Sequence, residues 1–210
     1  MPTTFQFFNP AAKVTISHCH LPHWDQANAT YFITWRTADS IPREIWLLAH
    51  DINPAAKDWR FDLEMLDQEA RDDFRQFARA LEKELDACHG DCPLKTPHLA
   101  TIVADSLHHF DGTRYTLGDY VIMPNHVHLL VGGLQRQAML KQVESWKKWT
   151  AIQINESLNR RGRFWQDESF DHLVRNESFF FGKFRAYIAK NPVTARLKPH
   201  EFILWQRTSS

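Results

Sequence analysis

Two histidines, His126 and His128, lie one residue apart in the apolar stretch VIMPNHVHLLV. Side chains alternate across a β-strand, so both imidazoles share one face while Val127 and Leu129 share the other. The apolar face is expected to join a core, which leaves the imidazoles on the opposite, open face of a sheet. Neutral imidazoles this close together can bind one cation, although polar surface histidines are the ordinary alternative.

Two neutral ligands hold a divalent ion weakly, so such a site needs a third group, preferably an oxygen. Tyr187 and Asn191 stand four residues apart in RAYIAKNP and therefore share one helical face. Asn191 offers an amide oxygen, and the phenol of Tyr187 can attack a metal-bound phosphate to form a phosphotyrosine ester. The alternative is that Tyr187 packs against the sheet and Asn191 caps the helix.

The composition is that of a globular protein with one well-filled core, because 43% of the 210 residues are apolar and 24% are charged. No stretch approaches the roughly 18 consecutive apolar residues of a membrane span, and the start lacks the build of a signal peptide. Three sparse cysteines suit a reducing compartment, and the spacing of Cys88 and Cys92 favours ordinary loop residues over structural zinc. We therefore expect a cytoplasmic protein that does not contact membranes.

The net charge of zero hides an uneven distribution. Residues 1–131 contain 11 basic and 18 acidic residues, whereas residues 132–210 contain 14 basic and 7 acidic residues. The C-terminal part is therefore a candidate for contact with an anion, and a merely solvated surface is the alternative.

The periodicity of apolar residues changes repeatedly along the chain. Strands are expected at 30–37, 114–123, 126–132 and 164–174, and helices at 66–88, 96–110, 138–159 and 176–190. The last helix is expected to end at Lys190, because the residue before Pro192 disfavours helical geometry. Without the acidic helix 66–88, the order βαββαβ predicts an α+β, ferredoxin-like antiparallel sheet with helices on one face. The acidic helix is then an insertion, and the last helix an addition that carries Tyr187.

Five segments carry a resemblance to a known family. They are YVIMPNHVHLLV, FWQDESFDHLVR, YIAKNPVTA, HWDQANATYFITWRTADSIP and DSLHHFDGTRYTLGDYVIMP. Together they resemble the REP-associated tyrosine transposases, which are relatives of the single-strand insertion-sequence transposases of the HUH class. The resemblance extends from about His23 to Leu197.

The resemblance implies roles for particular residues. His126 and His128 match the histidines that ligate Mg²⁺ or Mn²⁺, and Asn191 matches the polar third ligand. Tyr187 matches the single nucleophilic tyrosine. These relatives cut single-stranded DNA at the foot of palindromic hairpins, form a 5′-phosphotyrosine, release a 3′-hydroxyl and can rejoin strands. The alternatives are a hairpin-DNA-binding protein of the same fold that has lost cleavage, and an HUH replication-type nickase.

Basic and aromatic residues of the C-terminal part are candidates for DNA contact. Phosphate contacts are expected from Lys147, Lys148, Arg160, Arg161, Arg163 and Arg175. Trp165, with Phe164, can stack on unpaired bases, although core packing is the common role of such residues. His172 and Arg175 are candidates for a place near the reacting phosphate, with a hydrogen-bonded structural histidine as the alternative for His172.

The resemblance also suggests a domain organisation. We expect an N-terminal extension at 1–28, a single HUH transposase-like catalytic domain at 29–198 with an inserted helix at 66–90, and a C-terminal tail at 199–210. A monomer that binds REP-like hairpins of single-stranded DNA is expected, with a dimer that exchanges tyrosine helices as the alternative. One departure is Arg196, which stands where relatives usually have glycine, so the backbone after the tyrosine helix is in doubt.

Overall fold

The computed structural model describes most of the chain outside residues 42–82. The described residues are 5–9, 11–12, 15–18, 22–41, 83–167 and 169–208, with the backbone alone described for 15–18 and 22–25. The expected acidic helix 66–88 lies outside this part of the chain, except for its end, where residues 83–86 are helical. Cys19 also lies outside the described residues.

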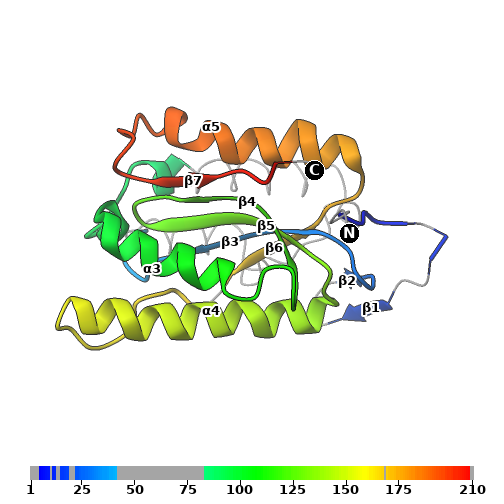
Figure 1. Ribbon diagram of the computed structural model, residues 1–210, viewed down its shortest axis with the longest axis horizontal. Helices are drawn as coiled ribbons and strands as arrows, with labels where there is room; N and C mark the ends of the chain where they lie inside the picture. The colour runs from blue at the N-terminus through cyan, green and yellow to red at the C-terminus, as the bar shows by residue number, and fades with distance from the viewer. Residues whose placement is uncertain are drawn as a thin grey trace.

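A five-stranded sheet forms the centre of the molecule (Figure 1). Its strands are β3 (Tyr31–Arg36), β4 (Thr116–Ile122), β5 (His126–Gly132), β6 (Phe170–Leu173) and β7 (Ile203–Trp205). They lie in the order β6-β3-β5-β4-β7, and every neighbouring pair is antiparallel. A separate ribbon pairs β1 (Thr15–His18) with β2 (Pro22–Asp25).

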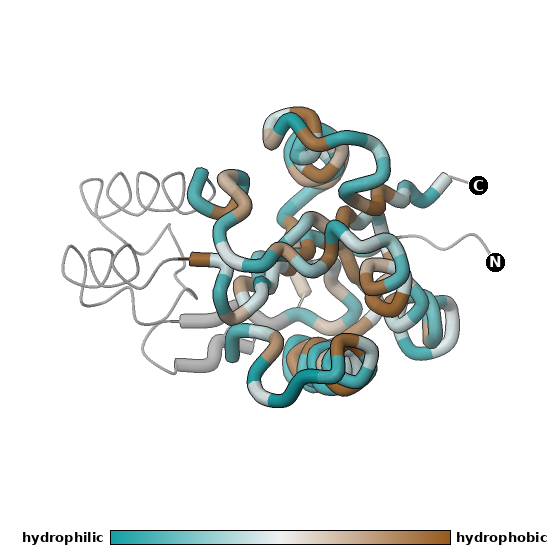
Figure 2. The backbone as a smooth tube through the Cα atoms, turned by 90° about the vertical axis from the view of Figure 1, so that its left-hand side faces the viewer, coloured by the Kyte–Doolittle hydropathy of each residue, from teal (hydrophilic) through white to brown (hydrophobic). Residues whose placement is uncertain are grey.

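Helices cover both faces of the sheet. On one side lie α3 (Pro97–His108), preceded by the short η2 (Pro93–Lys95), and α4 (Arg136–Ser157). On the other side lie the π-helical segment η3 (Phe179–Arg185) and α5 (Ala186–Thr194), so the view along α4 shows the sheet between two helical layers (Figure 2). The α+β ferredoxin-like fold is confirmed, because β3, α3, β4, β5, α4 and β6 follow one another in the expected order. The expectation of an open second face is wrong, because η3 and α5 cover it.

The main core lies between the sheet and the α3–α4 layer, and it confirms the alternation expected for β5. Val127, Leu129 and Val131 are completely buried in this core with Ile33 and Trp35 of β3. Leu130 instead joins a second core, which lies under η3 and α5. The two apolar sets therefore divide between the two faces as the period of two requires.

The second core is aromatic and fixes η3 and α5 against the sheet. Phe32 of β3 stacks on Phe184 with ring centroids 4.7 Å apart, and Phe5 contacts Phe180 at 4.8 Å. Ile188 of α5 is fully buried in the same cluster. Aromatic contacts of this kind contribute about 0.5–1.5 kcal/mol each beyond the area that they bury.

The last helix extends past Lys190, which corrects the expected end. Asn191 and Pro192 are both inside α5 and buried. The preference of a pre-proline residue for extended geometry is overcome here, because the last turn closes through hydrogen bonds from Ala195 N to Asn191 O and from Leu197 N to Pro192 O. Asn191 therefore faces the protein interior and is not a terminal cap.

Arg196 ends this helix in a left-handed conformation, with φ of 54°. Its N–H donates to Val193 O while that of Leu197 donates to Pro192 O, which is the Schellman pattern of a helix end. Glycine is favoured at this position because it has no Cβ to clash. The chain thus keeps the expected backbone geometry despite the missing glycine, at a cost in free energy.

Arg196→Gly is expected to stabilise the protein by roughly 0.5–1 kcal/mol, because relief of the left-handed strain exceeds the added entropy of the unfolded chain. Urea denaturation at fixed pH measures the change. Lys198→Gly is the control, because Lys198 has no positive φ and should lose stability when replaced. Equal effects of the two substitutions would contradict the strain argument.

Candidate active site

His126 and His128 lie side by side on the face of the sheet that α5 covers. Their side chains are 1% and 3% exposed, and their ring centroids are 4.6 Å apart in an edge-to-face arrangement. Both therefore project from the same face, as the alternation requires, but from a buried position. The ring nitrogens of two imidazoles removed from water need partners, either protein atoms or a ligand.

Hydrogen bonding to Asn125 determines which nitrogen of His126 carries the proton. Asn125 is fully buried, and its amide nitrogen donates to His89 O at 3.3 Å, which leaves its oxygen facing His126. That oxygen lies 2.8 Å from Nδ1 of His126 and can only accept, so Nδ1 carries the hydrogen. Nε2 of His126 then bears a free lone pair, and it is buried with no hydrogen-bond partner among the described residues. This is the arrangement in which a histidine binds a metal ion.

His128 is held between a strand neighbour and the tyrosine. Nδ1 lies 2.6 Å from Oγ1 of Thr34, its register partner on β3, and Nε2 lies 3.3 Å from the hydroxyl of Tyr187. In the tautomer that donates from Nδ1 to Thr34, the lone pair of Nε2 faces the phenol. The contact joins β5 and α5 at the two groups expected to carry the chemistry.

Burial keeps both histidines neutral. It lowers the pKa of His126 from 6.5 to about 3. Burial, and then the neighbouring His126, lower the pKa of His128 well below its ordinary value. Only a neutral imidazole has a lone pair to offer, so the site keeps this capacity across the physiological pH range.

The metal-free protein is expected to lose stability as pH falls below about 6.5. The unfolded chain binds a proton on His126 near pH 6.5, whereas the folded chain does so only near pH 3, so acid favours unfolding in this window. Between pH 7 and 5, His126 alone accounts for roughly 2 kcal/mol. Urea denaturation at several pH values in the presence of a chelator measures the slope. His126→Gln should flatten it, and equal slopes for variant and wild type would contradict this origin.

Contacts along α5 place Tyr187 over His128. Phe184 stacks on Phe32, and one turn later the ring of Tyr187 lies 5.1 Å from that of His128, two residues further along the strands. Because a helical turn of about 5.4 Å is close to the two-residue repeat of a strand, we expect the next turn to bring Asn191 to the level of His126. The packing of α5 thus brings Tyr187 to the histidines, and the place of Asn191 beside them stays a prediction.

Asn191 contributes a second unpaired acceptor to this site. Its side chain is 4% exposed, and its Oδ1 has no hydrogen-bond partner among the described residues. A buried amide oxygen and the bare Nε2 of His126 both lack a donor, which suits a bound cation. Two imidazole nitrogens and one amide oxygen form a donor set that fits a divalent ion. No group of three or more His, Cys, Asp or Glu residues that could hold a metal occurs in the described part of the chain, so Asn191 is needed to complete this one.

The structure corrects the expectation that Trp165 stacks on DNA bases. Trp165 and Phe164 are 4% and 1% exposed and belong to the main core. The indole N–H of Trp165 donates to Oγ1 of Thr150 on α4 at 2.9 Å. The apolar pattern of the sequence did not show whether these two aromatic residues stack on bases or pack in the core. Their burial shows that they pack in the core.

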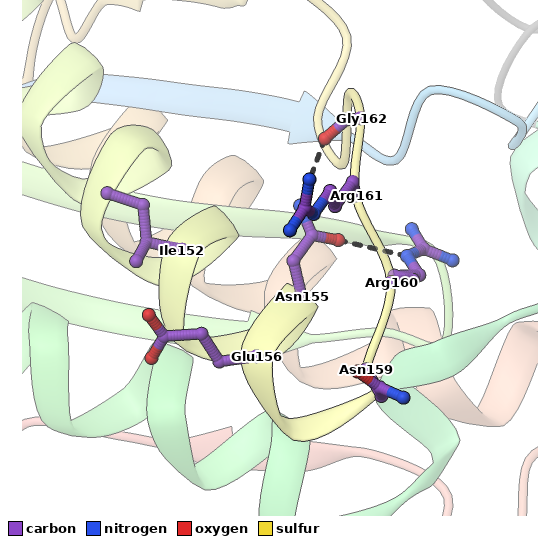
Figure 3. Close-up of a pocket in the computed structure, with 7 residues that line it drawn as sticks. All are labelled: Ile152, Asn155, Glu156, Asn159, Arg160, Arg161 and Gly162. Carbon is purple, nitrogen blue, oxygen red and sulfur yellow. Dashed lines mark hydrogen bonds between the residues drawn. The ribbon is translucent and has the colours of Figure 1, made fainter.

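The basic residues after α4 surround an open hollow of about 490 Å³ (Figure 3). Its lining residues are Ile152, Asn155, Glu156, Asn159, Arg160, Arg161 and Gly162. Asn155 holds the turn together, because it donates to Gly162 O and accepts from Nε of Arg160, both at 2.9 Å. Arg161 is exposed at this turn. The backbone bond from Gln166 N to Arg36 O ties the following segment to the end of the sheet where His126 lies.

The remaining candidates for DNA contact are spread over the molecule. Lys148 is exposed on α4, whereas the ammonium of Lys147 donates to Asp167 O and Arg163 pairs with the carboxylate of Asp167 at 2.8 Å. His172 pairs in register with Phe32 and lies 5.4 Å from the ring of Phe184. Arg175 follows Val174 beyond the Thr30 end of β3, away from the histidines. Proximity of Arg175 to the tyrosine is therefore not supported, and its role in DNA contact stays a prediction.

Sequence reasoning missed several residues that shape the site. Asn125 was not among the predicted site residues, although its position directly before His126 was a signal. Thr34 and Arg36 pair in register with His128 and His126, so they share the site's face of the sheet, and Arg36 is 8% exposed. No local pattern pointed to them, because the register between β3 and β5 is a long-range property.

Comparison with known proteins shows which family the segment around this site is similar to. Residues 97–191 match the model of the family described as "Transposase IS200 like", and this segment contains both histidines, Tyr187 and Asn191. This match covers less than half of the chain, and it shows that the segment is similar to that family. The matched segment begins with α3 and ends within α5 at Asn191, so it includes α3, α4, the β4–β5 hairpin and the part of α5 that carries Tyr187. No curated protein matches the chain.

One solved structure matches most of the chain at low sequence identity. It is described as the structure of a REP-associated tyrosine transposase bound to a REP hairpin. The sequences are 11% identical, the match covers 90% of this chain and 91% of the other, and the TM-score is 0.42. Among the described residues, no helix is both long enough and apolar enough to span a bilayer.

Proposed function

We propose that the protein is a metal-dependent tyrosine transposase that cleaves and rejoins single-stranded DNA at palindromic hairpins. The observation that carries the proposal is the contact between the Tyr187 hydroxyl and Nε2 of His128, 3.3 Å apart, beside two buried acceptors that lack donors. A nucleophile and candidate ligands for a cation thus lie on one face of the sheet. That combination suits phosphoryl transfer to a side chain.

In the proposed reaction, the phenolic oxygen of Tyr187 forms an ester bond to the phosphorus of the scissile phosphate. The bond from phosphorus to the 3′ oxygen breaks, and that oxygen leaves with a proton as a free 3′-hydroxyl. The product is a 5′-phosphotyrosine, so the energy of the phosphodiester is kept and attack by a 3′-hydroxyl can reverse the step. Thr34 fixes the ring of His128, and Nε2 of His128 contacts the phenol in the metal-free protein; the same lone pair would pass from the phenol to the cation when the cation binds.

His126, His128 and Asn191 would hold the divalent cation. A bound Mg²⁺ or Mn²⁺ supplies charge stabilisation at the phosphoryl oxygens. Asn125 supports the site by holding the lone pair of His126 Nε2 free for a ligand. The side chains described here do not discriminate between the two metals, since amide oxygen and imidazole accept either.

The preference for hairpins and the REP-like character of the DNA rest on the family resemblance of the motifs. The basic turn at residues 160–163 provides a candidate path for the DNA backbone, because it lies at the His126 end of the sheet. A protein that binds hairpins without cutting them is less well supported, since the Schellman end of α5 forms despite Arg196.

Arg161→Gln is expected to weaken hairpin binding and to lower the slope of log affinity against log salt by about 1, as for the loss of one phosphate contact. Fluorescence anisotropy with a labelled hairpin at several salt concentrations measures both values. Arg114→Gln is the matched control, because Arg114 lies over the ring of Phe110 and precedes the start of β4. That end of the sheet is far from His126 and from the basic turn. An unchanged slope for Arg161→Gln would remove this turn from the binding surface.

A labelled hairpin oligonucleotide with a single-stranded flank tests the whole proposal. Incubation with Mn²⁺ should give a covalent protein–DNA adduct that survives denaturation, and a chelator should prevent it. Peptide mapping should place the DNA on Tyr187. No adduct under any metal condition, or an adduct on another residue, would overturn the proposal.

A further inference from the structure

A buried carboxylate, Asp119, connects the tyrosine helix to the far end of the chain. Asp119 belongs to a bulge in β4, where the register with β5 shifts between Leu117 and Tyr120. Gly118 allows the bulge, because a Cβ at this position would lie 2.7 Å from the Cβ of Leu130. A bulge redirects a side chain, and here the carboxylate of Asp119 meets the start of the tyrosine helix.

The carboxylate receives donors from two separate segments. Oδ2 accepts from Nε of Arg185 at 2.7 Å, and Oδ1 accepts from the backbone N–H of Arg207 at 2.9 Å. Gln206 approaches Oδ2 at 3.4 Å. The side chain of Asp119 is 1% exposed and that of Arg185 is 19% exposed, so this is an ion pair largely removed from solvent. Breaking one partner of such a pair is costly, because the other is left buried.

The arginine is also bonded to the C-terminal segment. Nη2 of Arg185 donates to Arg207 O at 2.9 Å, and the guanidinium of Arg207 pairs with Asp111. Strand β7 continues this connection, because it pairs with β4 through Tyr120 and Trp205. One carboxylate thus fastens both the tyrosine helix and the C-terminal strand to the same bulge.

Arg185 lies where the orientation of the tyrosine helix is set. Arg185 is the last residue of the π-helical η3 and lies two positions before the proposed nucleophile, Tyr187; α5 starts at the residue between them. A π-helical turn is wider than an α-helical one, so the residue at the junction determines the rotation of the helix that follows. If the junction were free, the rotation of α5 would depend mainly on non-directional apolar contacts, such as those of Phe184, Tyr187 and Ile188.

We propose that Asp119 is a positioning residue that, through Arg185 and the Arg207 segment, fixes the rotation of α5 so that Tyr187 and Asn191 face the two histidines. The inference rests on the proposed function for its catalytic consequence. A misplaced nucleophile reacts slowly even when substrate binds normally, since about 1 Å of error can cost about 100-fold in rate. The C-terminal segment is therefore part of the catalytic arrangement, although it carries none of the reacting groups.

The first test measures rates on saturating hairpin DNA with Mn²⁺. Asp119→Asn and Arg185→Gln should each slow adduct formation by about 10- to 100-fold while the hairpin dissociation constant stays within about twofold. Arg185→Lys should recover part of the rate, because it keeps the charge but loses the second bond to Arg207 O. Asp105→Asn, at an exposed position of α3, should behave as the wild type.

The second test does not depend on cleavage. Amide hydrogen exchange of peptides covering residues 179–195 should accelerate about 10-fold or more in both variants, while peptides from α4 keep their protection. If Asp119→Asn does not fold, Arg185→Gln carries both tests. Wild-type rates and exchange in Arg185→Gln would overturn the inference. Absence of an adduct in the wild type, with the exchange difference present, would overturn the proposed function and leave the positioning role intact.

Discussion

Tyr187→Phe is expected to abolish the covalent adduct with hairpin DNA, with a fall in rate of at least about 10⁴-fold, as for the loss of a nucleophile. The substitution removes only the hydroxyl that lies 3.3 Å from Nε2 of His128. The ring keeps its edge contact with Phe32, so α5 should stay in place. Denaturing gel electrophoresis of labelled DNA measures the adduct, and anisotropy should show unchanged hairpin affinity.

Tyr120→Phe is the matched control for this loss. Its hydroxyl also lies beside a histidine, 3.1 Å from Nε2 of His108, but the residue belongs to the core on the other face of the sheet. Adduct formation should therefore persist in Tyr120→Phe. If Tyr187→Phe still forms an adduct, or if both variants lose it, Tyr187 is not the nucleophile or the assay reports only on folding.

Asn191→Ala is expected to remove the stabilisation of the protein by divalent metal. A ligand at about 100 times its dissociation constant stabilises the folded state by about 2.7 kcal/mol, and most of this increment should disappear. The substitution deletes the buried Oδ1 that has no donor among the described residues and leaves two nitrogens, which hold the ion weakly. Thermal melting with Mn²⁺ and with chelator measures the difference, and adduct formation should fall with it.

Asn191→Asp separates metal binding from packing. A carboxylate is a stronger ligand than an amide, so metal should shift the melting temperature at least as much as in the wild type. Without metal, the same variant should be less stable, because the new charge is buried beside neutral histidines. A wild-type metal shift in Asn191→Ala would exclude Asn191 from the cation site.

Most elements of the fold follow from local periodicity. The hairpin at residues 116–132 and the helices α3 and α4 lie within a few residues of the expected ranges. The fourth strand is shorter than expected, because only Phe170–Leu173 pairs with β3. Strand β7 was not expected, since three residues carry too little pattern and the strand is defined by its pairing with β4. The division of the chain into extension, domain and tail stays a prediction.

The candidate site divides in the same way. It was predictable that His126 and His128 share a face, because their spacing matches the period of a strand, and that Tyr187 and Asn191 share one, because theirs matches the turn of a helix; the catalytic and metal-binding roles of the four residues stay predictions. The burial of Trp165 in the core was not predictable, because an aromatic residue before a strand has the same local sequence pattern whether it is buried or exposed.

The sequence alone determined which side chains share a face, since the periods of strand and helix are properties of neighbouring residues. Only the tertiary structure decided that η3 and α5 cover the histidines, that Asn125 leaves Nε2 of His126 free, and that Asp119 holds Arg185. These features depend on contacts between residues far apart in the chain. Such contacts exist only after the sheet, its bulge and the last helix have packed together.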